Sequence, residues 1–124
     1  MKAQDVMAKA QQAVTSAQLL LGAGDVDGAC NRAYYAMFDA ARVALLASGQ
    51  EVGKTHKGVL NAFSEHLVKT GTFPKEVGRL LKHAETFRYI ADYEGGSVEQ
   101  SDACVMVNQA KIFVETVREK FMPN

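Results

Sequence analysis

The chain has 124 residues, of which 48% are hydrophobic, and it carries equal numbers of basic and acidic residues, 14 of each. This length suits one domain, and a helical core of this size buries roughly two-thirds of the surface that the unfolded chain exposes. The balanced charge excludes a strong basic field of the kind that drives non-specific nucleic-acid binding, so any contact with RNA must be local.

The first half of the chain predicts two long helices. Apolar residues recur at helical spacing over residues 4–21, and a glycine-rich run then breaks the pattern. A second helix begins near Asp25 or Asp27, either of which is a suitable N-cap, and runs to Ser48 with Gly49 as its C-terminal glycine. Because apolar residues lie on several of its sides, we expect it to be the central helix, or to meet a second subunit as well.

The second half predicts three further helices. Residues 56–69 form a third helix behind Thr55, and Pro74 sits in the first turn of a fourth, which ends at a glycine pair. Ser97, followed by Gln100, has the form of a capping box and opens a fifth helix. The short connections favour antiparallel neighbours, so the sequence predicts an all-α, antiparallel up-and-down bundle of four to five helices in one domain over residues 1–124.

The N-terminus and the cysteines indicate the cellular compartment of the chain. The first twelve residues are polar and mixed in charge, and no apolar run approaches the ~20 residues that a bilayer requires. We therefore expect a cytoplasmic protein without a membrane segment. Cys30 and Cys104 lie among apolar neighbours in helical registers, which predicts two small core residues and no disulfide.

Arg88 is the most informative residue of the fourth helix. The apolar stripe of that helix centres near Ala84, and a turn of about 100° per residue places Arg88 about 40° from this centre. A buried guanidinium costs several kcal/mol unless it is paired, and Asp92 is the nearest candidate, one turn later. Two interpretations stay open: a salt bridge at the edge of the core, or a site that binds an anion.

Lys54, Thr55 and His56 stand at the start of the third helix, where free backbone N–H groups and the helix dipole favour a phosphate. The same pattern is typical of an ordinary capped helix with a basic flank.

A second candidate surface lies on the second helix. Its outer face presents four polar or charged residues that suit RNA or a protein partner, or simply water: Arg32, Tyr35, Asp39 and Arg42. The adjacent Tyr34 is expected in the core.

No pattern indicates a metal or a cofactor. His56, His66 and His83 are scattered, and no cysteine or acidic residue stands beside them at ligand spacing. The sequence also lacks a glycine-rich phosphate loop behind a strand and a nucleophilic serine motif. We therefore expect neither a metal site nor a cofactor.

Three ordered blocks resemble a known family. These are NRAYYAMFDAA over residues 31–41, KTHKGV over residues 54–59 and RYIADY over residues 88–93. Together they resemble a small prokaryotic branch of the HEPN domains, and the likeness spans nearly the whole chain. The resemblance implies an up-and-down bundle that often dimerises. It also implies a minimal nucleotidyltransferase as partner, in toxin–antitoxin or defence modules.

Many proteins of this family are metal-independent ribonucleases, and here the sequence departs from their motif. In the family motif four to six residues stand between an arginine and the histidine that follows it. The histidine acts as the base and the arginine binds the phosphate, usually in pairs across a dimer. In this chain Tyr93, not a histidine, follows Arg88 after four residues, and Arg79 and His83 are separated by only three. His56, from the third helix or from a second subunit, is the remaining candidate for the base.

The sequence is therefore compatible with three functions. The first is a HEPN-type component of a two-protein module that binds nucleotide or RNA and a nucleotidyltransferase, with Tyr89 or Tyr93 as a possible target of nucleotide transfer. The second is a metal-independent endoribonuclease toxin with Arg88 and His56 as catalytic residues. The third is a non-catalytic dimeric scaffold. The predicted nucleotide- or RNA-binding residues are Lys54, His56, Arg88, Asp92, Tyr93, Arg32 and Tyr35.

Overall fold

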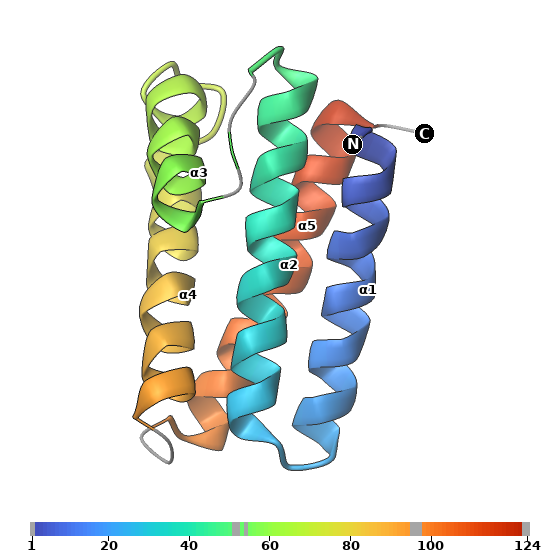
Figure 1. Cartoon of the computed structure of the whole chain (residues 1–124), viewed down its shortest axis with the longest axis vertical. Coiled ribbons are helices and arrows are strands. Elements are labelled where there is room, and N and C mark those ends of the chain that lie inside the picture. The colour runs from blue at the N-terminus through green and yellow to red at the C-terminus, as the bar shows by residue number, and fades with distance from the viewer. Residues whose placement is uncertain (1, 51–52, 54, 95–97, 123–124) are drawn as a thin grey trace.

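The computed structural model describes residues 2–50, 53, 55–94 and 98–122, and all regular structure within them is helical (Figure 1). The prediction of an all-α bundle is confirmed, and the expected helix bounds hold to within a few residues. In chain order the elements are α1 (Ala3–Gly22), α2 (Val26–Ala47), α3 (His56–Phe63), the π-helical segment η1 (Ser64–Val68), α4 (Lys75–Tyr93) and α5 (Gln100–Phe121).

The four long helices alternate in direction, and α2 stands at their centre (Figure 1). It contacts α1, α4 and α5 along its length, and it also contacts α3. Small residues on several sides of α2 are fully buried and let the neighbouring helices approach closely, among them Ala29, Ala33, Ala36, Ala40 and Ala44. The expectation that this helix is central is therefore confirmed. The short α3 runs beside α4 (Figure 1).

Two helix starts are fixed by side-chain caps. Asp25 Oδ1 accepts a hydrogen bond from the backbone N–H of Gly28 at 2.8 Å, and Thr55 Oγ1 accepts one from Gly58 at 3.2 Å. A Cβ atom at Gly58 would lie 2.6 Å from Thr55 Oγ1, so only glycine leaves room for this cap. The cap fixes His56 as the first residue of α3, where its side chain meets residues of α2 and α4.

The third helix differs from the prediction in its second half. The sequence predicts one α-helix over residues 56–69, but α3 gives way to a π-helical turn, in which the N–H of Lys69 donates to the carbonyl of Ser64 at 2.9 Å. This turn lies against α4, where a Cβ atom on Gly78 would come within 3.2 Å of Val68. Turns of this kind are rare and are often found near functional sites.

Two other predictions are corrected or fall outside the described residues. Cys30 is buried and free, but Cys104 is also free and is exposed, because the core-facing positions of α5 belong to residues such as Ala103 and Met106. Helix α5 begins at Gln100 with Glu99 in the N-cap position. Ser97 and the glycine pair before it lie outside the described residues.

None of the described helices combines the length and the apolar composition that a bilayer crossing requires.

Candidate functional site

Arg88 turns toward the bundle, as its register predicts. Its side chain is 12% exposed, and its Nη1 donates a hydrogen bond to Asp92 Oδ2 at 3.3 Å. The guanidinium carbon lies 5.1 Å from the centre of the Tyr34 ring, whose face attracts a cation at this range. Arg88 therefore has a carboxylate and an aromatic face as partners inside the bundle.

His56 is the third partner of Arg88 and comes from the start of α3. Its Nδ1 lies 3.2 Å from Arg88 Nη2, and its Nε2 lies 3.4 Å from the hydroxyl of Tyr35. A guanidinium can only donate hydrogen bonds, so Nδ1 must be the acceptor. A neutral imidazole then carries its proton on Nε2 and donates it to the Tyr35 oxygen. In this arrangement both ring nitrogens of His56 are engaged.

Three aromatic side chains of α2 form the wall behind His56. The ring centres of Tyr34, Tyr35 and Phe38 lie 5.3, 5.5 and 4.9 Å from the centre of the imidazole. Tyr34 is fully buried, as the sequence predicts, whereas Tyr35 is half-buried and belongs to the site. The central helix thus positions the histidine of α3 against the arginine of α4.

Asn31 and Arg32 extend the network toward the start of α2. The Nδ2 of Asn31 lies 3.3 Å from both carboxylate oxygens of Asp92, and the Nε of Arg32 donates to Asn31 Oδ1 at 3.2 Å. The guanidinium carbon of Arg32 also lies 5.1 Å from the centre of the Tyr35 ring. Asp92 therefore links two arginines, one directly and one through an amide.

Asn31 belongs to this network, although the sequence does not single it out as a site residue. It opens the first of the three family-like blocks and stands beside Arg32, and these are the signals that point to it. Its contact with Asp92 spans 61 positions in the chain. A helical pattern within α2 carries no information about a residue on α4, so the pair becomes visible only once the helices are packed.

Arg88 stays protonated at this position. Burial by itself lowers the pKa of Arg88, but the hydrogen bond with Asp92 and the interactions with Tyr35 and Tyr34 outweigh it, so the pKa is raised. Burial also raises the pKa of the Tyr34 hydroxyl above its usual range, and the carboxylate of Glu85 adds to this effect while Arg88 opposes it. The site therefore contains a permanent cation and a neutral phenol.

Two buried polar atoms of the site have no hydrogen-bond partner within the described part of the chain: the Nε of Arg88 and the hydroxyl of Tyr34. Buried donors are nearly always paired in proteins, because leaving one unpaired costs about 1–3 kcal/mol. The hydrogen-bonding capacity of Arg88 is therefore not fully used by the described chain.

The other predicted site residues lie in different places. Tyr89 and Tyr93 are 56% and 69% exposed on α4, and their ring centres are 4.8 Å apart, so they form an aromatic pair on the surface next to Asp92. Lys54 lies outside the described residues.

Asp39 and Arg42 make an ion pair with each other at 3.5 Å, further along α2. Burial raises the pKa of Asp39, and the nearby Arg42 opposes the rise. The set of polar residues predicted on α2 therefore divides into two: Arg32 and Tyr35 join the network around Arg88, whereas Asp39 and Arg42 form a separate pair.

Within the described residues no three histidine, cysteine or acidic side chains gather as metal ligands would. His83 packs edge-on against Phe87, with 5.4 Å between the ring centres. Of the three histidines, only His56 contacts Arg88 in the described structure.

Comparisons with known proteins give one family. The HEPN domain matches the chain over residues 3–120. A UPF0332 protein from Gloeobacter violaceus is 36% identical over 118 residues, which cover 94% of this chain and 93% of that protein. A UPF0332 protein from Thermotoga maritima is 33% identical over 90% of this chain and 84% of its own. A protein named "Putative toxin" from Methanocaldococcus jannaschii is 27% identical over 89% of this chain and 81% of its own.

Proposed function

The chain belongs to the HEPN domain family, and we propose that it is the HEPN component of a two-protein, toxin-like module that binds a nucleotide or RNA through Arg88. The module includes a nucleotidyltransferase as the second protein, and the HEPN chain acts in the cytoplasm as a homodimer. The similarity to two proteins of Methanocaldococcus jannaschii named "Putative toxin" supports the toxin-like character.

The observation that carries the proposal is the contact between Arg88 and His56. The guanidinium of Arg88 bears N–H donors suited to a phosphate, and it meets His56 at 3.2 Å beside the rings of two tyrosines. Arg88 shares its one carboxylate, Asp92, with Asn31, and it keeps an unpaired Nε within the described chain. A phosphate oxygen is a stronger acceptor for a guanidinium than an imidazole nitrogen is, because the hydrogen bond then joins two charged groups. A phosphate bound beside Arg88 therefore competes well with His56 for the hydrogen bonds of the guanidinium.

The module is tested by growth and by co-purification. The chain is expressed alone and together with the protein encoded next to it, which the proposal expects to be a nucleotidyltransferase, and growth is followed after induction. The proposal predicts that growth stops when the chain is expressed alone, that the second protein restores it, and that the two proteins purify as a complex. Unchanged growth in both cultures, with no complex, contradicts the proposal.

The exposed tyrosine pair offers the nucleotidyltransferase a target. Tyr93 and Tyr89 lie exposed on α4, within two turns of Arg88. Incubation with the partner enzyme and ATP is expected to add one nucleotidyl group to the intact mass, and Tyr93→Phe or Tyr89→Phe identifies the residue. An unchanged mass of the wild-type chain rules out this modification.

A second function, metal-independent cleavage of RNA, is favoured by one specific feature. In the family motif the histidine follows the arginine closely in sequence, whereas here His56 contacts Arg88 from α3, which lies beside α4. When Arg88 turns from His56 to a bound phosphate, the Nδ1 lone pair becomes free. It can then accept the proton of a ribose 2′-OH while the guanidinium steadies the charge on the phosphorus oxygens.

Digestion of a labelled single-stranded RNA without added metal separates the two functions. Cleavage that is lost in both Arg88→Ala and His56→Ala supports the ribonuclease. If all three proteins give equal products, or if the wild type gives none, this site does not cleave RNA and only the binding function remains. The scaffold interpretation predicts something different again, because Arg88→Ala then lowers the melting temperature and alters no binding.

A further inference from the structure

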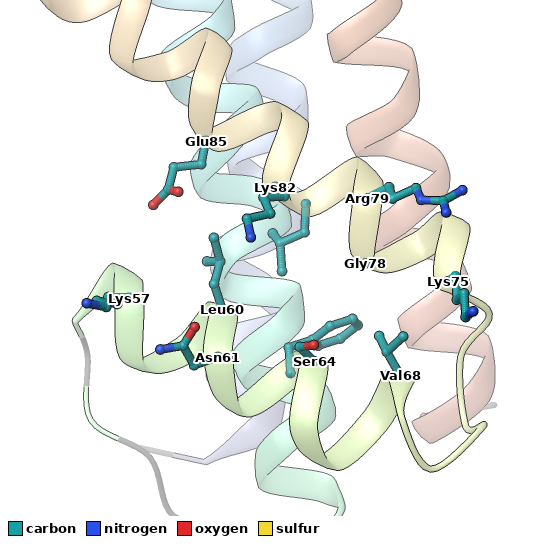
Figure 2. A pocket seen from close by; sticks show the side chains of 12 residues that line it. Lys57, Leu60, Asn61, Ser64, Val68, Lys75, Gly78, Arg79, Lys82 and Glu85 are labelled. Atoms are coloured by element: carbon teal, nitrogen blue, oxygen red, sulfur yellow. The ribbon is translucent and has the colours of Figure 1, made fainter.

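A hollow of about 600 Å³ lies between the α3–η1 segment and the first half of α4 (Figure 2). The α3–η1 side contributes Asn61, Ser64 and Val68, and Figure 2 shows them across from Gly78 and Lys82 of α4. Sites for small molecules commonly have volumes of about 300–1,000 Å³. The hollow is therefore large enough for a ligand of the size of a nucleotide.

The lining of the hollow is strongly basic for a chain with no net charge. Four cations, Lys57, Lys75, Arg79 and Lys82, line it together with a single carboxylate, Glu85. All four cationic residues are exposed, and none of them makes an ion pair within the described residues. Their charges are therefore available to an anion.

The floor of the hollow is apolar. Leu60 and Val68 are half-buried and expose apolar surface to it, and the almost completely buried Phe63 and Leu81 support them from below. Asn61 and Ser64 add exposed polar groups on the α3–η1 side. An apolar base with a few polar groups and a cationic rim suits a ligand that combines a flat ring with phosphates.

We propose that this hollow is a second binding site, which takes a nucleotide with its ring against the apolar part of the lining and its phosphates on the α4 side, near Arg79 and Lys82. It goes beyond the proposed function, because none of its residues belongs to the network around Arg88. The same chemistry is offered by a free nucleotide and by one unit of an RNA strand. The hollow lies next to the Arg88 network, since Lys57 follows His56 in the chain.

The test uses two probes, ATP and a single-stranded uridine octanucleotide, with affinities measured by calorimetry and by fluorescence anisotropy. The double variant Arg79→Gln/Lys82→Gln removes two cations from the hollow. Its matched control, Lys9→Gln/Lys111→Gln, removes two cations from exposed positions on α1 and α5.

We expect the hollow variant to bind at least one probe about tenfold more weakly than the control does. Where the RNA is the probe, the slope of the logarithm of the binding constant against the logarithm of the salt concentration should become shallower by about 0.7 for each cation removed. Loss for ATP identifies a free nucleotide as the ligand, and loss for the RNA alone identifies a strand. Equal affinities of the hollow variant and the control for both probes overturn the proposal.

A third variant tests the shape of the site without changing its charge. Ser64→Phe adds a ring to the lining of the hollow at an exposed position. Circular dichroism confirms that the variant is folded, and the proposal predicts the same loss of affinity as the charge variant shows. Binding that survives this substitution contradicts a ligand seated in the hollow.

Two further measurements distinguish a nucleotide site from a surface that attracts any anion. A decaglutamate peptide that binds as tightly as the RNA, with the same sensitivity to Arg79→Gln/Lys82→Gln, shows that the surface responds to charge alone and overturns the assignment to a nucleotide. Titration of Arg79→Gln/Lys82→Gln in an Arg88→Gln background measures the hollow apart from the Arg88 site. A further loss of affinity beyond that of Arg88→Gln alone supports a second site, and no further loss overturns it.

Discussion

Arg88 on α4 and His56 on α3 are 32 positions apart in the chain, yet Arg88 Nη2 lies 3.2 Å from His56 Nδ1. The contact has a fixed direction, because the guanidinium donates and the imidazole accepts. It also has a cost, since the site holds a buried cation with one shared carboxylate. Under the proposed function, a bound phosphate takes over the hydrogen bond that Arg88 now makes with His56.

The cap of α3 is predicted to control the position of His56. Thr55→Ala removes the oxygen that accepts from Gly58, and the loss of such a cap costs about 1 kcal/mol. We expect chemical denaturation to show this loss, together with weaker RNA binding, because the first turn of α3 carries His56. Thr55→Ser keeps the oxygen and should behave as the wild type. A Thr55→Ala variant with unchanged stability contradicts the role of the cap.

The two cysteines are predicted to differ sharply in reactivity. Burial, with help from the nearby carboxylates of Asp27, Asp102 and Asp92, raises the pKa of Cys30 to about 11. Cys30 therefore stays a protonated thiol at pH 8, whereas Cys104 is exposed. Brief treatment with iodoacetamide should modify Cys104 alone, as peptide mass spectrometry will show. Equal labelling of both thiols in the folded protein contradicts the buried position of Cys30.

The raised pKa of Cys30 also predicts a loss of stability in alkali. In the unfolded chain the thiol ionises near its ordinary pKa of 9.0, but in the folded chain only near 11. The folded state thus binds the proton more tightly, and its advantage is complete below pH 9 and shrinks as the pH rises toward 11. The Cys30→Ala variant should lose less stability than the wild type across this range. Parallel curves of unfolding free energy against pH for the two proteins contradict the assignment.

The hydroxyl of Tyr34 is predicted to add little to stability, although its ring adds much. The oxygen is buried without a partner in the described chain, and the ring packs against His56, Tyr35 and Phe38. Tyr34→Phe should therefore leave the free energy of unfolding within about 0.5 kcal/mol of the wild type or raise it. Tyr34→Ala should lower it by about 3–5 kcal/mol, because a large cavity opens beside Arg88. A large loss in Tyr34→Phe would reveal a partner for the hydroxyl.

The sequence predicts what a single helix determines, and much less of what depends on how helices meet. The inward turn of Arg88 follows from its angle to Ala84 within α4, and the cap by Thr55 follows from local hydrogen bonding. By contrast, the bond between Asn31 and Asp92 depends on the packing of α2 against α4, which no periodic pattern contains.

The π turn after α3 shows the same limit. It lies where Val68 approaches Gly78, and only the packed structure reveals that closeness. The prediction that Cys104 lies in the core is wrong for a related reason, because apolar neighbours in sequence occupy several sides of α5 and do not identify the side that faces the core.

The affinity for a single-stranded RNA oligonucleotide, measured by fluorescence anisotropy for the wild type and for Arg88→Gln, tests the central claim most directly. Arg118→Gln, which removes a partly exposed arginine from α5, serves as the control for charge. Because a hydrogen bond to a charged group contributes about 1.5–3 kcal/mol, Arg88→Gln should bind at least about tenfold more weakly, while circular dichroism shows an intact bundle. A folded Arg88→Gln protein that binds the RNA as tightly as the control does would contradict the account.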